Sequence, residues 1–363
     1  MRKIILLLSA IIIAFSSCQK NNAPAPAKVP SSDLRNLPSA TTAVTPGTDV
    51  YVVGGYATPT SGVAAYWKNG TLVSLNDGFD LLDIAVSGND VYVAGSTLAS
   101  PNSPLQHAAY WKNGVINNLS FGTSSTFNSI ARGIAINGSD VYVVGEYTDH
   151  SNGNAVSKPI LWKNGIPQDL SYNSFQATAS AIALIGSDVY ITGFSSLSSN
   201  SIRIATVWKN GVATRIAGSS INSWGKDIAV NGSDVYITGY TAPADNSSNT
   251  AVYWKNGVLN PIRSNADAEA ITINNNNVYV AGLVHYSDGN IQAASWKNGV
   301  ATVYGPLNTL ITSDITVSGS DTYVLAQSGF LLDPQNNIYY YKNGAAYLVS
   351  YNAIGTRMLV VQH

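Results

Sequence analysis

The sequence predicts an all-β protein: a seven-bladed β-propeller of four-stranded antiparallel blades that is closed by its own C-terminal strand. Three observations support this prediction. Two short motifs alternate seven times along the chain, the composition is rich in strand and turn residues, and one further strand-like segment follows the seventh repeat. Repetition at a fixed period is the sequence signature of such repeat architectures.

The first motif is the tetrapeptide Trp-Lys-Asn-Gly, with one Tyr-Lys-Asn-Gly variant. Its copies recur about every 46 residues, the size of one propeller blade. They begin at Trp67, Trp111, Trp162, Trp208, Trp254, Trp296 and Tyr341. Asn-Gly between apolar residues favours a type I′ hairpin turn, because both residues tolerate a positive φ. The motif therefore predicts the turn between the third and fourth strands of each blade. The tryptophan is expected to pack between blades, with stacking on sugars as the alternative.

The second motif is Asp-Val-Tyr-(Val/Ile)-x-Gly or a near variant, and one copy precedes each copy of the first motif. The copies begin at Asp49, Asp90, Asp140, Asp188, Asp234, Asn277 and Asp321. Before the motif lie a Gly-Ser or Gly-Asn turn and an apolar stretch such as Asp83–Val86. These segments are the expected second and first strands. Aspartate is favoured in tight turns because its side chain hydrogen-bonds nearby backbone amides, so a turn-forming role is expected rather than a catalytic one.

A ring is the expected way to bury both faces of such a unit. A linear solenoid would also do so, but it would need polar caps at its ends. The chain instead adds the strand-like segment Thr356–Val361 after its last repeat. The first repeat has only Ala43–Pro46 in the corresponding place, and its proline cannot donate a ladder hydrogen bond. We therefore expect the C-terminal strand to complete the first blade.

The N-terminus predicts export and a lipid anchor. Arg2 and Lys3 precede an apolar run, Ile4–Phe15, and then Ser16, Ser17 and Cys18. The run is about a dozen residues, short of the roughly 20 that span a bilayer as a helix. Cys18 is the only cysteine and its setting resembles the bacterial lipobox, which implies acylation of its thiol, with palmitate among the expected acyl groups. An ordinary signal peptide is the alternative.

Three segments follow from this pattern: a lipoprotein signal peptide at 1–18 with Cys18 as the first mature residue, a flexible Pro- and Ala-rich tether at 19–39, and the propeller at 40–363. The expected location is the cell envelope, anchored to the outer membrane, on its periplasmic or its outside face. The formal net charge is −1 and 11% of residues are charged, which argues against a nucleic-acid partner.

The repeat also resembles the bacterial extracellular HAF repeats, in which a valine-glycine strand precedes His-Ala-Phe, a tryptophan and a glycine turn. The best matching copy is His107–Gly114 (HAAYWKNG). The resemblance extends over the whole body at the level of the repeat. It implies an exported, propeller-like array, and the family brings no established activity.

No catalytic constellation is apparent in the sequence. The four histidines have no metal-ligand spacing, and neither Cys-x-x-Cys nor Gly-x-Ser-x-Gly occurs. Asp149–Asn154 and Asp288–Asn290 resemble calcium loops in composition but lack the full ladder of ligands. We therefore expect no cofactor and no metal, with calcium as the alternative, and an enzymatic activity is the less favoured hypothesis.

Alternating strands place the Gly-Ser and Lys-Asn-Gly turns on one rim of the propeller and the longer, variable loops on the other. Those loops are expected at 97–107, 121–132, 147–158, 217–226, 241–250 and 327–337. Loops on a rigid scaffold often carry binding residues. The candidate ligand-binding residues on this rim are the aromatic residues and histidine Tyr147, Trp224, His285 and Tyr286, with the acidic strand starts Asp83, Asp227, Glu269 and Asp314 at the channel mouth.

Two functions are compatible with this pattern. The first is a non-catalytic envelope binding module whose variable rim engages a glycan or a partner protein. The alternative is a propeller-type lyase or glycoside hydrolase at the channel mouth, which would need two carboxyl groups about 5 to 10 Å apart. Solvated strand ends would give the same acidic pattern.

Overall fold

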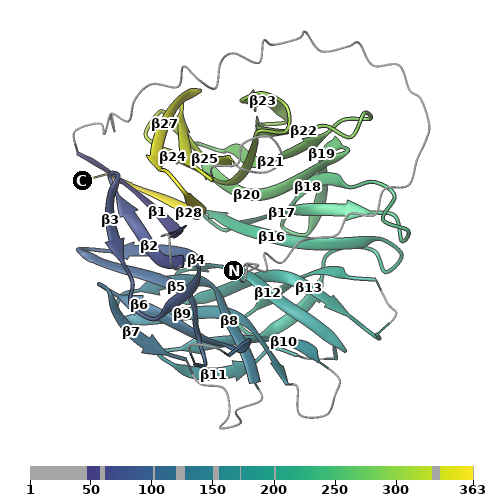
Figure 1. The fold of residues 1–363 in the computed structure, drawn as a ribbon. Helices are drawn as coiled ribbons and strands as arrows, with labels where there is room; N and C mark the ends of the chain where they lie inside the picture. The colour runs from purple at the N-terminus through teal and green to yellow at the C-terminus, as the bar shows by residue number, and fades with distance from the viewer. Residues whose placement is uncertain are drawn as a thin grey trace, which may run out of the picture. The chain divides into compact units, whose positions relative to one another are not determined.

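Seven four-stranded antiparallel sheets surround a common axis (Figure 1). The structure is a computed structural model and describes residues 47–57, 62–100, 103–119, 127–149, 155–171, 173–199, 202–328 and 336–362. No helix occurs among these residues. The predicted seven-bladed propeller is confirmed, whereas the signal peptide, Cys18 and the tether lie outside the described residues.

Each blade runs from an inner to an outer strand. Blade 1 comprises β28 (Ala353–Gln362), β1 (Thr48–Ala57), β2 (Gly62–Lys68) and β3 (Thr71–Ser74). Blades 2 to 4 comprise β4 (Gly78–Ser87), β5 (Asp90–Leu98), β6 (Gln106–Lys112), β7 (Val115–Asn118); β8 (Phe127–Asn137), β9 (Asp140–Asp149), β10 (Val156–Lys163), β11 (Ile166–Asp169); and β12 (Gln176–Ile185), β13 (Asp188–Ser196), β14 (Ile204–Lys209), β15 (Val212–Arg215). Blades 5 to 7 comprise β16 (Asn222–Asn231), β17 (Asp234–Ala242), β18 (Thr250–Lys255), β19 (Val258–Ser264); β20 (Ala266–Asn274), β21 (Asn277–His285), β22 (Ile291–Lys297), β23 (Val300–Tyr304); and β24 (Leu310–Ser318), β25 (Asp321–Ser328), β26 (Ile338–Lys342), β27 (Ala345–Ser350).

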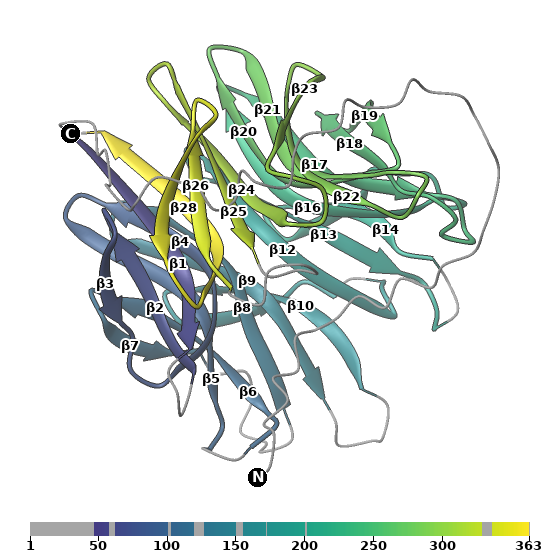
Figure 2. The ribbon, with the colours of Figure 1, turned by 45° about the horizontal axis from the view of Figure 1, so that its top comes forward.

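The C-terminal strand closes the ring, as the sequence predicts. β28 pairs antiparallel with β1, so that Thr48 lies opposite Gln362 and Tyr56 opposite Ala353. Figures 1 and 2 show the yellow strand β28 beside the purple strand β1. Blade 1 therefore takes its inner strand from one end of the chain and its other three strands from the opposite end.

The two repeated motifs bind each other within every blade. In blade 5, the Asp234 carboxylate accepts a hydrogen bond from Asn256 Nδ2 at 2.7 Å and pairs with Lys255 Nζ at 2.7 Å. Asn256 Oδ1 in turn accepts the backbone N–H of Val235 at 2.9 Å, and Lys255 lies over the Tyr236 ring. The repeated aspartates are thus turn stabilisers, as expected, but through the side chains of the neighbouring hairpin rather than through local amides.

The glycine at the end of the second motif is explained by the shape of the neighbouring inner strand. Each inner strand contains a β-bulge opposite this glycine, or opposite Ala326 in blade 7, which bends the inner strand towards it. In blade 5 the bulge lies between Gly225 and Asp227, and a Cβ on Gly239 would lie 1.8 Å from the Trp224 carbonyl oxygen. The glycine is therefore needed for close approach of two backbones. The residues at these seven bulges are Leu82, Arg132, Ser180, Lys226, Glu269, Ser313 and Thr356, and β4 has a further bulge at Phe79.

The hydrophobic core lies between neighbouring blades, in seven clusters that each draw on two adjacent sheets. The six repeated tryptophans sit in these clusters and are at most 2% exposed. Their predicted role as packing residues is confirmed. Closure of the ring adds the cluster between blades 7 and 1, so every blade is packed on both of its faces.

The propeller has two chemically different faces. The turn face carries the two-residue turns, such as Gly232-Ser233 and Asn256-Gly257, with Asn256 and Gly257 both at positive φ as the Asn-Gly pair predicts. The loop face carries the longer connections. All six segments predicted as loops are partly strand, and in two of them an inner strand begins before its bulge, β8 at Phe127 and β16 at Asn222. Among the described residues, no helix is long and apolar enough to cross a membrane.

Candidate functional site

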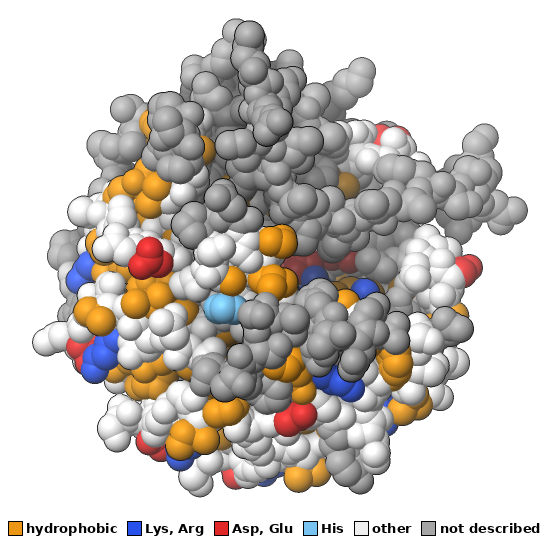
Figure 3. Space-filling model, turned by 60° about the horizontal axis from the view of Figure 1, so that its bottom comes forward, with side chains coloured by type: hydrophobic (Ala, Val, Ile, Leu, Met, Phe, Trp, Pro, Cys, Tyr) orange, Lys and Arg blue, Asp and Glu red, His pale blue; other side chains and the backbone are white. Residues whose placement is uncertain are grey.

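The centre of the loop face is the part of the molecule where chemically distinctive side chains gather. β16 runs from the loop face inwards and presents Trp224, Lys226 and Asp227 in that order. Lys226 is the bulge residue, and a bulge re-aims the side chain that it carries. Figure 3 shows acidic and basic side chains together in the hollow near the centre of the visible face. They form two layers.

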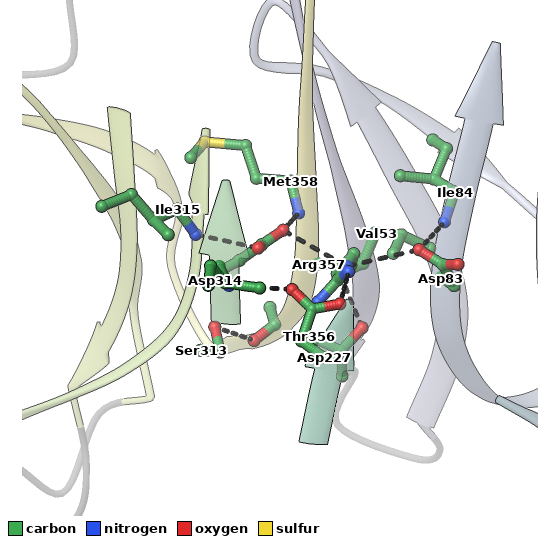
Figure 4. A network of polar contacts seen from close by, with 12 residues as sticks. Val53, Asp83, Ile84, Asp227, Ser313, Asp314, Ile315, Thr356, Arg357 and Met358 are labelled. Carbon is green, nitrogen blue, oxygen red and sulfur yellow. Dashed lines mark hydrogen bonds and ion pairs between the residues drawn. The ribbon is translucent and has the colours of Figure 1, made fainter. Parts of the chain in front are cut away.

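The deeper layer is the axial cluster, which consists of Arg357 with Asp83, Asp227 and Asp314 (Figure 4). Arg357 Nη2 lies 2.6 Å from Asp227 Oδ1, and its Nε lies 3.4 Å from Asp83 Oδ1 and 3.6 Å from Asp314 Oδ2. Arg357 belongs to blade 1, whereas its partners belong to blades 2, 5 and 7. One guanidinium therefore links four blades across the axis.

The same aspartates also join neighbouring blades through the backbone. Asp83 accepts the N–H of Ile134 at 2.8 Å, Asp227 that of Ile271 at 2.9 Å, and Asp314 that of Met358 at 2.6 Å. In each case the donor belongs to the inner strand of the next blade. These carboxylates thus have structural partners, and they are not solvated strand ends.

The buried Asp227 and Asp314 and the partly buried Asp83 share one cation in this cluster. Burial raises the pKa of Asp314 to about 7, although Arg357 opposes the shift. Burial also raises the pKa of Asp83. Burial by itself lowers the pKa of Arg357, but the carboxylates, Asp227 first, hold it well above its ordinary value. The arginine therefore stays charged while Asp314 titrates near neutrality.

The outer layer, called the loop-face group below, consists of Arg203, Trp224, Lys226, Asp267, Glu269 and His285 from blades 4, 5 and 6. The Trp224 ring is held by a hydrogen bond from its Nε1 to Ser180 Oγ at 2.8 Å and by an edge-on contact with Phe194. Lys226 Nζ lies 4.7 Å and the Arg203 guanidinium 5.2 Å from the centre of the Trp224 ring. Two cations therefore flank one partly exposed aromatic ring.

Acidic residues complete this group on blade 6. Lys226 pairs with Glu269 at 3.3 Å, and His285 Nε2 lies 2.7 Å from Asp267 Oδ2. Burial lowers the pKa of Lys226, but the Glu269 carboxylate outweighs it and the pKa is raised. Burial raises the pKa of Asp267, but the hydrogen bond with His285 and smaller contributions from Asn249 and Lys226 outweigh burial. The pKa of Asp267 is therefore lowered. Within the described chain, the Arg203 guanidinium forms no ion pair.

The candidate residues from the sequence belong to different groups in the structure. Trp224, Glu269 and His285 come together in the loop-face group. Asp83, Asp227 and Asp314 form the axial cluster instead.

Two further candidates lie apart from both layers. Tyr147 packs edge-on against Phe127 and donates its hydroxyl to Asp169, and Tyr286 donates to Gln292 within blade 6.

Sequence reasoning missed four residues of these layers: Arg203, Lys226, Asp267 and Arg357. Lys226 and Arg357 lie at or next to the bulge of an inner strand, so a position-by-position alignment of the seven inner strands would have shown both as departures from the repeat. Arg203 and Asp267 carry no such signal. In the part of the chain that the structure describes, no group of three or more His, Cys, Asp or Glu side chains could hold a metal ion.

Comparison with known proteins identifies the fold and no family. No family model and no curated protein matches the chain, so the HAF resemblance stays a prediction. Among solved structures, the chain is similar to the Pyrococcus horikoshii acylaminoacyl peptidase, at 11% identity over 85% of this chain and 51% of that chain, with a TM-score of 0.51. A puromycin-hydrolyzing peptidase of Mycobacterium tuberculosis matches at 7% identity over 83% and 53%, with a TM-score of 0.54.

The β-propeller domain of the Trilobed protease from Pyrococcus furiosus is also similar, at 8% identity over 85% of this chain and 95% of that chain, with a TM-score of 0.48. The chain spans about half the length of the other two peptidases. At such identities the likeness shows the fold.

These comparisons correct the expected function. The sequence suggested a non-catalytic envelope module for a glycan or a partner protein, but the two solved proteins above with TM-scores of 0.51 and 0.54 to this chain are peptidases. The error has a physical source. Seven near-identical repeats suggested a uniform centre, whereas the structure places different charged side chains at the equivalent bulge positions of blades 3, 5 and 6, namely Arg132, Lys226 and Glu269.

The alternative, a glycosidase or lyase at the channel mouth, relied on the acidic strand starts. Asp83, Asp227 and Asp314 are committed to Arg357 and to backbone amides, and Glu269 to Lys226. The hypothesis of a glycosidase or lyase at the channel mouth is therefore wrong as well.

Proposed function

We propose that this protein is a hydrolase-associated propeller that receives the charged end of a peptide substrate at the centre of its loop face. The observation that carries the proposal is the loop-face group itself, in which Arg203 and Lys226 flank the Trp224 ring next to the Glu269 carboxylate. The names of the peptidases with this fold support the choice of hydrolase and of a peptide as its substrate.

The chemistry of the loop-face group suits a peptide terminus. A guanidinium that lies on an aromatic ring keeps its N–H donors directed outwards, where a carboxylate can accept two of them. The partly exposed Trp224 ring offers a face for an apolar or aromatic side chain. Glu269 and Asp267 provide negative charge nearby for an amino group. A neutral polymer would offer no charged group to bind these charged side chains.

Peptide binding can be measured through Trp224 itself. It is the one tryptophan outside the repeated motif, and the six repeated tryptophans are buried. We expect Ala-Ala-Phe with free termini to change the tryptophan emission and to protect it from acrylamide quenching. The same peptide with acetyl and amide caps should bind at least tenfold more weakly. No response to either peptide, or equal affinity for both, would contradict the proposal.

Replacing Lys226 with methionine is expected to weaken binding of the free peptide about fivefold, a loss of roughly 1 kcal/mol typical of a partly exposed charge. The matched control is Lys209→Met. Like Lys226, Lys209 lies over an aromatic ring, here that of Tyr190, and pairs with a carboxylate, here that of Asp188, but it lies on the turn face. The control should bind like the parent. Hydrolysis of an Ala-Ala-Phe anilide by cell envelopes should fall when the gene is deleted and recover with the parent but not with Lys226→Met.

We also propose that the protein is exported and anchored through Cys18, which rests on the signal-like first 18 residues and the lone cysteine. Labelled palmitate should enter the parent protein in growing bacteria, and Cys18→Ser should abolish the label while leaving the propeller folded. A parent protein that is released from the cell without label would support an ordinary signal peptide instead.

A further inference from the structure

A ring of exposed apolar side chains marks the turn face. The residue directly after each Lys-Asn-Gly turn begins an outer strand, and in five consecutive blades it is a large aliphatic residue that is 67–72% exposed. These residues are Val115, Ile166, Val212, Val258 and Val300. Equivalent positions of equivalent blades lie on one circle around the axis, so the five side chains line the same edge.

The fold does not require a large aliphatic residue at this position. Blade 1 has Thr71 and blade 7 has Ala345 there, and both form the same turn and strand. Threonine would satisfy the β preference of the position as well as valine does. Large exposed aliphatic residues that recur in one place on a surface usually mark an interaction site.

The N-terminal segment joins the propeller on the turn face. The described chain begins at Gly47, and β1 starts on the turn face, where Asp49 pairs with Lys68 of the first Lys-Asn-Gly turn at 2.7 Å. Residues 19–46, which connect Cys18 to the propeller, therefore join it on the turn face. A lipid on Cys18 would therefore attach the propeller to the membrane from its turn face.

We propose that the turn face rests on the surface of a lipid bilayer, with the five aliphatic side chains inserted among the headgroups. The orientation relies on the proposed anchor, but the contact itself does not. Four of the five lysines that precede these residues add no net charge to the ring, because Lys112, Lys163, Lys209 and Lys255 each pair with an aspartate at 2.7–2.9 Å. Lys297 lies over the Tyr279 ring, and its blade has Asn277 in place of the aspartate. Binding therefore depends on apolar insertion rather than on anionic lipid.

The test uses the chain from residue 18 onwards with Cys18→Ser, so that no acyl chain contributes. It is sedimented with phosphatidylcholine vesicles and with vesicles that also contain phosphatidylglycerol. We expect binding to both, and at least a fivefold loss when all five aliphatic residues become threonine. The matched control replaces five exposed apolar residues of the loop face with threonine: Phe79, Phe175, Leu197, Ile221 and Tyr351, which are 38–60% exposed.

Each outcome decides the matter. The control variant should bind vesicles like the parent, and both variants should keep the melting temperature of the parent. Absence of vesicle binding by the parent, equal binding by the turn-face variant, or binding only with phosphatidylglycerol would overturn the proposal. Peptide binding by the turn-face variant is measured in parallel, and it should be unchanged, so failure of the membrane contact is distinguishable from failure of the proposed function.

Discussion

Ending the chain after Ser350 is expected to abolish cooperative folding of the propeller. The deletion removes β28, which pairs with β1 along its whole length and contributes the buried Met358 to the cluster between blades 7 and 1. Loss of this strand exposes the inner edge of β1 and removes Arg357 from the axial cluster. The truncated protein should bind a hydrophobic dye, be digested rapidly by protease and show no sharp thermal transition.

Two matched proteins control this experiment. Removal of His363 alone should have no effect. A circular permutant in which Val361 is joined to Asp49 by Gly-Ser, and which is opened between Ser247 and Ser248, should fold at least as stably as the parent, because other blades connect these two strands by the same two-residue turn. A truncated protein that melts within a few degrees of the parent would show that β28 is not the closing element.

The fold could be predicted from the sequence because its determinants are local and repeated. Asn-Gly pairs specify hairpins from their own φ preferences, and alternating apolar residues specify strands, so each blade could be recognised without knowledge of the others. Even the closing strand was recognisable, since Thr356–Val361 repeats the pattern of an inner strand. The bulges were not, because a bulge depends on the partner strand, and residues such as Trp224 were therefore assigned to loops.

The candidate site could be predicted only in part, because its contacts cross the ring. Arg357 meets Asp227, which is 130 positions away, only once seven blades have closed, and no local pattern marks such a pair. Asp83, Asp227 and Asp314 were correctly placed near the axis, but their partners and their burial were not foreseen. Trp224 and His285 were chosen from composition alone, and the blades that bring Lys226 and Glu269 beside them had to be seen in three dimensions.

Replacing Arg357 with methionine is expected to lower the free energy of unfolding by about 3–5 kcal/mol at pH 8, the usual cost of leaving a buried charge without its partner. Methionine keeps the length and apolar stem of arginine but leaves the buried Asp227 and Asp314 and the partly buried Asp83 with no cation. At roughly 2 °C per kcal/mol for a chain of this size, the melting temperature should fall by about 6–10 °C. The matched control is Lys255→Met, which breaks an exposed pair with Asp234 and should cost less than about 1 kcal/mol.

The pH dependence distinguishes charge from packing as the cause of this loss. An ordinary aspartate has a pKa near 3.9 in the unfolded chain, whereas burial raises the pKa of Asp314 to about 7 in the fold. Between these values the folded protein binds more protons than the unfolded one, so stability falls as pH rises from about 4 to 7. Arg357 lowers the pKa of Asp83 and Asp314, so without it these two carboxyl groups should take up protons at still higher pH. The destabilisation of Arg357→Met should therefore shrink by at least half between pH 8 and pH 5, while Arg357→Lys should be less destabilised at pH 8. A loss in Arg357→Met that is equal at both pH values would mean that the arginine contributes by packing alone, and that the charges of the axial cluster do not hold the ring together.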